Sequence, residues 1–271
     1  MNTPKFNSTH QHPLVRFAAF IVGPLFVFVS VLLLWQWLVT AREIPKFILP
    51  SPWQIIESAV ENRQRLQAAS IRTIGEAAGG LVVSSLLGFL IASVLSQSSL
   101  VRRSLLPYAI VFQTIPIIGV APLLITWFGN TFSTVVLIAA FISIFPVISN
   151  TTTGLISVDH AHLDLFRLNQ ANRWQVFWKL QVPTSMPLAV AGIKISSAAC
   201  VLGACVGDYF VGSAQQEGLG FLIFQAKDRD TGMMFATLFV LTVIGLVFFS
   251  VTSLLCQVLL LGWQERKLAN R

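Results

Sequence analysis

Charged residues are scarce in this sequence. Only 11% of its 271 residues are Asp, Glu, Lys or Arg, whereas 55% are hydrophobic, and the mean hydropathy is +0.74. Soluble globular chains carry about 25% charged residues, so this composition excludes that class. Runs of about ten strictly alternating residues, which are typical of transmembrane barrels, are also missing. The sequence therefore predicts an integral membrane protein built from helices.

Cysteine is rare, and recognisable catalytic motifs are missing. Cys200, Cys205 and Cys256 lie in apolar stretches without metal-ligand spacing, so we expect no disulfide framework and no metal site. His160 and His162 are two residues apart and off a common helical face, which argues against a membrane-embedded enzyme. No G-x-x-x-x-G-K-S/T loop surrounds any lysine, so we do not expect this chain to hydrolyse ATP.

Six long apolar stretches are present instead. Each is long enough, at about 1.5 Å per residue, to cross about 30 Å of hydrocarbon. They cover residues 17–39, 73–95, 104–128, 132–156, 184–212 and 233–262. The first is too long for the core of a secretion signal, so we expect a retained helix. Gln113, Pro116, Gly119 and Pro122 interrupt the third, which we expect to be kinked or partly unwound.

Lysine and arginine are distributed unevenly around these stretches. More of them lie at the two termini and in the interval 159–182 than in the connections on the opposite side. By the positive-inside rule, this bias places both termini and that interval in the cytoplasm. The net charge of +7 also suits contact with anionic lipid headgroups, and no basic aromatic surface for nucleic acid is present.

The interval 159–182 mixes charge with large apolar side chains such as Phe166 and Trp174. This mixture predicts short amphipathic helices that dock against another protein. We expect Asp159 to cap the first helix and residues 169–172, Asn-Gln-Ala-Asn, to form a corner before the second. A helix lying among lipid headgroups is the alternative.

Two further regions carry a local prediction. Residues 52–66 predict a short amphipathic helix at the outer surface, with Trp53, Ile56 and Val60 on one stripe. The stretch that follows is rich in Gly, Ala and Ser, whose small side chains allow close helix approach in lipid, so it predicts a packed interior helix. We expect the fifth span to start at Pro183 and Pro187.

Polar residues inside the spans are costly and are therefore candidates for a transport path. Lys194 either faces such a path or extends towards the cytoplasm, and these alternatives stay open. Asp208, near the outer end of the fifth span, either pairs across helices, stabilises the outer gate or is an ordinary interface carboxylate. Gln113, Thr114 and Pro116 are candidates for lining the path, because a proline break exposes carbonyl groups.

The order of several short motifs resembles one family of transport proteins. The motifs are LPSP at 49–52, FQTIP at 112–116, APL at 121–123, WFG at 127–129, FPV at 145–147, GL at 154–155, GD at 207–208 and GLG at 218–220. Together they resemble the permease subunits of binding-protein-dependent ABC importers, particularly those of nitrate, sulfonate, taurine, and thiamine-precursor or riboflavin systems. The resemblance runs from residue 49 to the last span.

In that family, a cytoplasmic loop with the pattern E-A-A, three residues, G supplies the helices that seat in the ATPase subunits. Aligned on residues 173–177 and on the two prolines of the fifth span, the glycine position falls at Gln170. The E-A-A positions fall at Asp164, Leu165 and Phe166, so only the acid is kept. The resemblance implies ATPase coupling by Asp164, Phe166, Arg167, Ala171 and Trp174.

The resemblance also implies the fold and the partners. The fold is all-α, the type I ABC importer permease fold of about six transmembrane helices with cytoplasmic coupling helices. Residues 1–16 would be a cytoplasmic tail, and 17–271 a single permease domain that contains the coupling segment 159–182. The implied partners are ABC ATPase subunits, a periplasmic or lipid-anchored solute-binding protein, membrane lipid, and a second permease copy or close relative.

The implied location is the bacterial cytoplasmic (inner) membrane, crossed several times. This chain would be no enzyme and would bind no cofactor, because the partner ATPase uses the ATP. We expect a small solute, either a small anion, a sulfonate-like compound or a vitamin precursor. An ion-coupled secondary transporter is the alternative, but intramembrane charges are few and no inverted repeat is visible.

Overall fold

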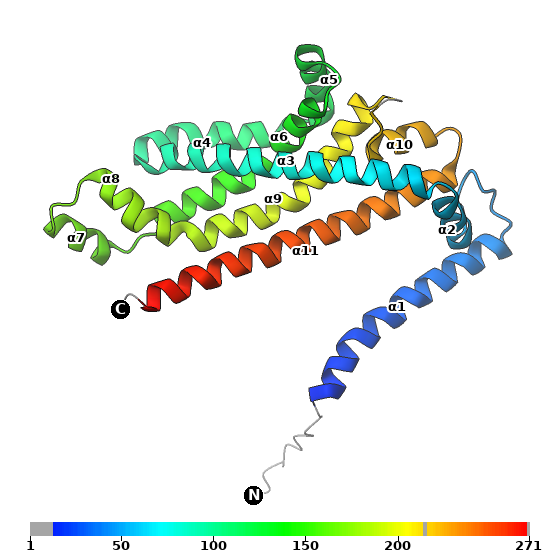
Figure 1. Cartoon of the computed structure of the whole chain (residues 1–271), viewed down its shortest axis with the longest axis horizontal. Helices are drawn as coiled ribbons and strands as arrows, with labels where there is room; N and C mark the ends of the chain where they lie inside the picture. Colours follow the sequence, from blue (N-terminus) through cyan, green and yellow to red (C-terminus); the bar gives the residue numbers. More distant parts are fainter. Residues whose placement is uncertain (1–12, 214–215, 270–271) are drawn as a thin grey trace, which may run out of the picture.

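The computed structural model describes residues 13–213 and 216–269 as a bundle of long helices with short helices at its two ends (Figure 1). The first helices are α1 (Pro13–Ala41), α2 (Pro52–Glu61), α3 (Arg63–Ser96), α4 (Ser99–Thr114), α5 (Ile117–Phe128) and α6 (Phe132–Ile156). They are followed by α7 (His160–Leu168), α8 (Arg173–Val176), the π-helical stretch η1 (Phe177–Gln181), α9 (Val182–Val211), α10 (Leu219–Ala226) and α11 (Thr231–Ala269).

Within residues 13–213 and 216–269, five helices are long and apolar enough to cross a membrane: α1, α3, α6, the continuous helix Arg173–Val211, and α11. The pair α4 and α5 makes a sixth span if it is counted as one. These two helices are bent by 93° at the break between them, which confirms the expected interruption of the third span. The cause is local, because a residue before proline is forced out of the α region, and Ile115 is extended at ψ 122° before Pro116.

The α-helix of the fifth span, α9, begins at Val182 with Pro183 in its first turn, as expected, but the helical backbone before it runs without a break from Arg173. A proline ring inside a helix clashes with the carbonyl four residues earlier. Here the turn before Pro183 is π-helical, and the Val182 amide donates to the carbonyl of Phe177, five residues back. This wider turn changes the carbonyl positions around the ring, so the helix continues.

Two other helix boundaries differ from expectation. The first helix begins at Pro13, so residues 13–16 of the expected tail are helical, while residues 1–12 lie outside the described part of the chain. The amphipathic helix after the first span is confirmed as α2, which Ser51 caps, but it ends at Glu61 rather than at Leu66. The Gln54 amide donates to Ser51 Oγ at 3.4 Å, and the Ser51 amide donates to Gln54 Oε1 at 3.1 Å.

The core lies where α3, α6 and α9 meet, and small residues set their spacing. A Cβ atom on Gly203 of α9 would lie 2.7 Å from the Cα of Ala139 on α6. One on Gly80 of α3 would lie 2.6 Å from the Ala139 Cβ. The small-residue face of α3 is therefore packed, as expected. Its opposite face exposes Val82 and Leu86, so α3 is buried on one side only.

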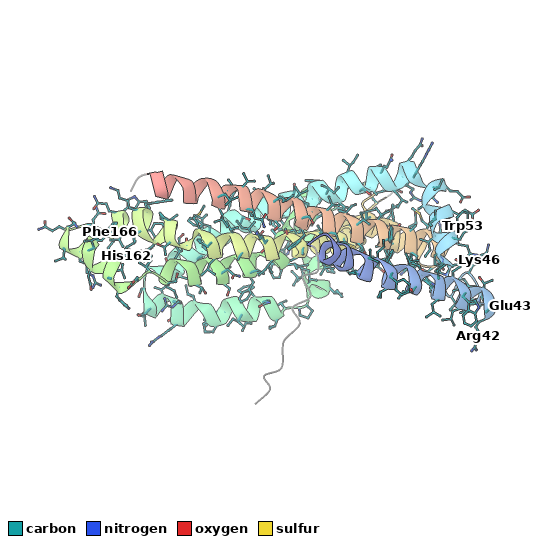
Figure 2. The ribbon with its side chains drawn as sticks, turned by 90° about the horizontal axis from the view of Figure 1, so that it is seen from below. Arg42, Glu43, Lys46, Trp53, His162 and Phe166 are labelled. Carbon is teal, nitrogen blue, oxygen red and sulfur yellow. The ribbon has the colours of Figure 1, made fainter. Side chains whose placement is uncertain are left out.

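Much of the outer surface of the bundle is apolar. In α1 and likewise in α11, only 6% of an 18-residue apolar stretch is buried inside the protein. Their large apolar side chains face outwards, as hydrocarbon contact requires. The polar ends are elsewhere: Arg42, Glu43, Lys46 and Trp53 lie at one end, and the α7 residues lie at the other (Figure 2). The axis across the membrane thus runs from the α1–α2 connection to α7.

Candidate functional site

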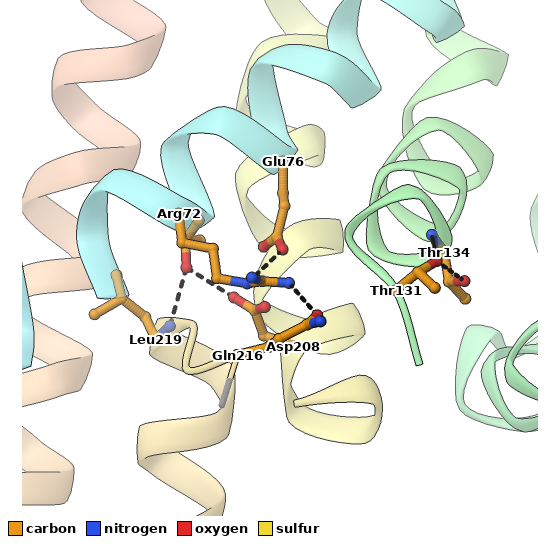
Figure 3. Close-up of polar contacts among 8 residues, drawn as sticks. Arg72, Glu76, Thr131, Thr134, Asp208, Gln216 and Leu219 are labelled. Atoms are coloured by element: carbon orange, nitrogen blue, oxygen red, sulfur yellow. Dashed lines mark hydrogen bonds and ion pairs between the residues drawn. The ribbon is translucent and has the colours of Figure 1, made fainter. Parts of the chain in front are cut away.

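A buried polar cluster ties α3 to α9 and to the start of α10 (Figure 3). We call it the polar latch, and it consists of Arg72, Thr73, Glu76, Asp208, Gln216 and the backbone of Leu219. The Thr73 hydroxyl donates to Asp208 Oδ2 at 2.7 Å and accepts from the Leu219 amide at 2.9 Å. Thr73, Glu76 and Asp208 are all buried. One hydroxyl therefore joins α3 to two segments that lie 135 and 146 residues further along the chain.

Arg72 supplies the positive charge of the polar latch. Its Nε atom lies 2.9 Å from Glu76 Oε1, one helical turn along α3, and its Nη2 donates to Gln216 Oε1 at 3.0 Å. The guanidinium also lies over the ring of Phe132, 5.7 Å from the ring centre. Buried carboxyl groups are tolerated only when they are paired and hydrogen-bonded. Arg72 and Thr73 therefore supply part of the pairing that the burial of Glu76 and Asp208 requires.

The GLG motif at 218–220 is explained by its closeness to the polar latch. A side chain on Gly218 would overlap the Asp208 carboxyl group, and one on Gly220 would overlap the carbonyl of Cys205. Beside them, Arg65 Nε donates to Glu217 Oε2 at 2.7 Å. The segment before α10 is thus held against both α3 and α9, and its glycines are required by close packing.

A second feature is a cavity of about 700 Å³ between α4 and the core helices. Its aromatic lining residues are Tyr108, Phe112, Phe141 and Phe145, and Gln113 adds an amide. The other lining side chains are Ile, Leu or Val, and none is charged. The volume falls within the usual range of small-molecule sites, about 300–1,000 Å³. The cavity can therefore hold a small organic solute next to the break between α4 and α5.

The third feature is the elbow, residues 159–182, which projects from the end of the bundle opposite the polar latch (Figures 1 and 2). The expected cap is confirmed, because Asp159 Oδ1 accepts from the Ala161 amide at 3.1 Å. Asn172 caps the next helix, with its Oδ1 accepting from the Gln175 amide at 2.8 Å. Both short helices of the elbow thus begin at a side chain that satisfies their free amides.

The expected corner between α7 and α8 is confirmed. The residue with the left-handed backbone conformation is Gln170, at φ 53°, rather than Asn169 or Asn172. The Ala171 amide donates to the Phe166 carbonyl at 3.0 Å and the Gln170 amide to the Arg167 carbonyl at 2.9 Å. This pair of bonds is the Schellman ending of a helix, which usually carries glycine at the left-handed position. Gln170 thus adopts the left-handed backbone conformation that glycine usually takes at this kind of helix ending.

Aromatic side chains connect the elbow to the core. The rings of Trp174 and Phe177 are stacked with centres 6.0 Å apart, and Trp178 meets Phe177 edge-on at 5.3 Å. Phe177 is buried and packs with Ala92 of α3 and Leu155 of α6. Trp174 and Trp178 remain exposed, as does the ion pair between Arg167 Nη1 and Asp164 Oδ1 at 3.0 Å. The elbow therefore exposes aromatic side chains to its surroundings, and buried Phe177 holds it against the core.

The structure does not bring all five candidate path residues together. Gln113 lines the cavity, and Thr114 and Pro116 lie at the adjoining break between α4 and α5. Lys194 lies on α9 near Cys256 of α11, away from the cavity lining. Asp208 belongs to the polar latch.

The five candidate coupling residues, Asp164, Phe166, Arg167, Ala171 and Trp174, all lie on the elbow. The sequence reasoning missed Thr73 and Glu76 of the polar latch. An acidic residue inside an apolar span was the signal that could have found Glu76.

Replacing Thr73 with Val should weaken the polar latch with little change in volume. The Leu219 amide and Asp208 would lose their buried partner, which costs about 1–3 kcal/mol in the free energy of unfolding. The melting temperature of the purified protein in detergent checks this result. Thr242→Val is the matched control, because its exposed hydroxyl bonds only the carbonyl of Leu238 in its own helix. Equal melting temperatures for the two variants would contradict the role of Thr73.

Replacing Gln170 with Gly should stabilise the elbow, because a left-handed backbone costs a residue with a Cβ about 1–2 kcal/mol. Gln170→Val should have the opposite effect, since a branched side chain tolerates this conformation least. Hydrogen exchange of the amides of α7 and α8 measures the difference. Slower exchange in the Val variant than in the Gly variant would argue against the left-handed corner.

Comparison with known proteins agrees with this geometry. Residues 84–266, more than half of the chain, match the family model described as binding-protein-dependent transport system inner membrane component. The chain is 32% identical over 237 residues to a probable ABC transporter permease protein of Haemophilus influenzae, covering 87% of this chain and 96% of the relative.

Two further relatives have named substrates. A formylaminopyrimidine transport permease protein of Halalkalibacterium halodurans is 29% identical over 247 residues, covering 90% of this chain and 96% of the relative. A riboflavin transport system permease protein of Chloroflexus aurantiacus is 31% identical over 241 residues, covering 86% and 87%. The extent of the family match and the identity over nearly the whole chain lead to one conclusion: this chain belongs to the family of binding-protein-dependent inner membrane components, the permease subunits of ABC importers.

Proposed function

We propose that this permease works in an assembly in which two ATPase subunits bind the elbow and a solute-binding protein binds the opposite end of the bundle. The observation that carries the proposal is the surface of the elbow. It exposes Trp174 and Leu168 beside the ion pair of Asp164 and Arg167, and buried Phe177 fixes it to the core. Exposed aromatic groups on a rigid base are typical of a protein contact.

The continuous helix Arg173–Val211 supports a mechanical role for the elbow. Phe177 lies near the elbow end of this helix, and Asp208 of the polar latch lies near its other end. A displacement of the elbow by closing ATPases would therefore reach the opposite end through one helix. The two states of the bundle would differ in which end is open, and ATP binding would favour one of them.

The charge bias supports a topology with both termini and the elbow in the cytoplasm of a bacterial cell and with the polar latch on the outer side of the inner membrane. The binding protein, periplasmic or lipid-anchored, would then dock near α2, where Lys46 and Trp53 are exposed. A second permease copy would cover part of the apolar surface of α4 and α5. The names of the relatives favour a vitamin precursor or a similar small solute as the transported compound.

An ATPase subunit should copurify with the tagged chain. The substrate-stimulated ATP hydrolysis of this assembly should fall in the Asp164→Ala and Arg167→Ala variants, while membrane insertion of the permease is unchanged. Each change removes one partner of the exposed ion pair at the ATPase contact. Lys227→Ala is the matched control, because Lys227 pairs with Asp228 at 3.9 Å at the other end of the bundle. Unchanged substrate-stimulated ATP hydrolysis in both elbow variants would contradict the role of Asp164 and Arg167 in ATPase coupling. Transport by this chain alone, driven by an ion gradient, would favour a secondary transporter.

A further inference from the structure

The polar latch buries more acidic groups than basic ones. Of the acidic side chains that the structure describes, only Glu76 and Asp208 are buried, with 0% and 1% of their surface exposed. Within the same part of the chain, Arg72 is the only basic side chain beside these two carboxyl groups (Figure 3). If both carboxyl groups were ionised, one buried negative charge would therefore lack a partner. A buried charge without a partner is strongly destabilising.

The elements around the polar latch offer no second cation within the described residues. Arg65 of α3 already pairs with Glu217, so its charge is balanced. Lys194 of α9 is several turns away from Asp208 along that helix. The thiol of Cys205, which lies near Asp208, carries no positive charge. The helices α6 and α10, and residues 231–261 of α11, contain no Asp, Glu, His, Lys or Arg.

The hydrogen bonds of the polar latch show the same shortage. Both oxygens of Glu76 and the Oδ1 atom of Asp208 are buried without a hydrogen-bond donor. The Arg72 Nε atom lies 2.9 Å from Glu76 Oε1, but it is not directed at this oxygen as a hydrogen bond requires. The carboxyl groups of Glu76 and Asp208 are close enough for a side-chain hydrogen bond to each other. Because ionised carboxylates only accept hydrogen bonds, this contact needs a proton on one of them.

A proton fits these groups better than a metal ion or a water molecule. A hard cation such as Ca²⁺ takes about six to eight oxygen ligands, whereas three oxygens lack a partner here. The guanidinium of Arg72 would also repel a metal ion at this place. A water molecule could donate hydrogen bonds, but it would leave the excess negative charge unbalanced. Gly218 also packs so closely on the Asp208 carboxyl group that a Cβ atom has no room there.

We propose that the polar latch is a proton-binding site in which Glu76 and Asp208 share one proton. The proton makes the group of two carboxyls and one guanidinium electrically neutral. It also supplies the missing hydrogen-bond donor between α3 and α9, next to the bond from Thr73 to Asp208. The closed arrangement of these helices is therefore the protonated one.

Separation of α3 from α9 would release this proton. Water would reach the two carboxyl groups, and exposed carboxyl groups are ionised at neutral pH. The proton would pass to water on the side of the membrane that the polar latch faces, so the open latch would hold one proton fewer than the closed latch. A rise of one pH unit on that side would therefore shift the equilibrium about tenfold towards the open latch.

Infrared difference spectroscopy of the purified permease assembly in lipid nanodiscs at neutral pH tests the proposal. When the spectrum of Glu76→Gln is subtracted from that of the unmodified protein, the carbonyl band of a protonated carboxyl group should remain, and it should shift in D₂O. Subtraction of Asp208→Asn should leave the same band, because either change leaves one carboxylate that Arg72 balances without a proton.

Glu217→Gln is the matched control, since Glu217 pairs with Arg65, and its subtraction should leave no such band. Absence of the band from both latch differences would overturn the proposal. A band that appears only after treatment with a metal chelator would assign the site to a metal ion and would overturn it as well.

Melting temperatures give a second test that does not depend on the spectra. Each single variant keeps the polar latch neutral, so its melting temperature should stay close to that of the unmodified protein. The double variant Glu76→Gln/Asp208→Asn leaves the guanidinium of Arg72 without a carboxylate, so its loss should exceed the sum of the two single losses. Additive losses, a clear rise in both single variants, or failure of both to fold would contradict a shared proton.

Neither measurement uses ATP or a solute. Both therefore test the proton of the polar latch separately from the proposed importer function, and either idea can fail while the other holds.

Discussion

Close contact between α6 and α9 is the constraint on which the rest of this structure depends. Gly203 allows the backbone of α9 to approach Ala139, and Gly207 does the same against Val135. In lipid there is no hydrophobic force between helices, so such tight packing is a main source of association. Because α9 is fixed in this way and continues into the elbow, a force on the elbow would be transmitted along the helix.

The three functional features lie around that core in a consistent arrangement. The elbow is attached by Phe177 between α3 and α6, and the polar latch joins α3 to α9 through Thr73 and Asp208 at the far end. The cavity lies between these ends, beside the break at Pro116. A permease of this kind needs an input for force, a site for the solute and a closure on the opposite side. Under the proposed function, the elbow would be the input for force and the polar latch would belong to the closure on the opposite side.

The sequence predicts the spans, the Asp159 cap and the break in the third span well, because each depends on residues that are neighbours in the chain. It places the corner of the elbow correctly but assigns the left-handed conformation to asparagine, since the helix ending that forces it onto Gln170 depends on hydrogen bonds between residues three and five positions apart. The continuation of the helix through Pro183 and the pairing of Thr73 with Asp208 depend on local π-helical geometry and on tertiary packing. Hydropathy and local preferences contain neither kind of information.

Site-specific photocrosslinking from the tip of the elbow tests the central claim most directly. Leu168, which is 81% exposed, can be replaced by benzoylphenylalanine in the intact bacterial membrane, and Phe47 at the opposite end, 75% exposed, serves as the control position. The account predicts a crosslink from position 168 to a nucleotide-hydrolysing subunit and none to that subunit from position 47. Crosslinks from position 168 to lipid alone, with the ATPase captured from neither position, would contradict it.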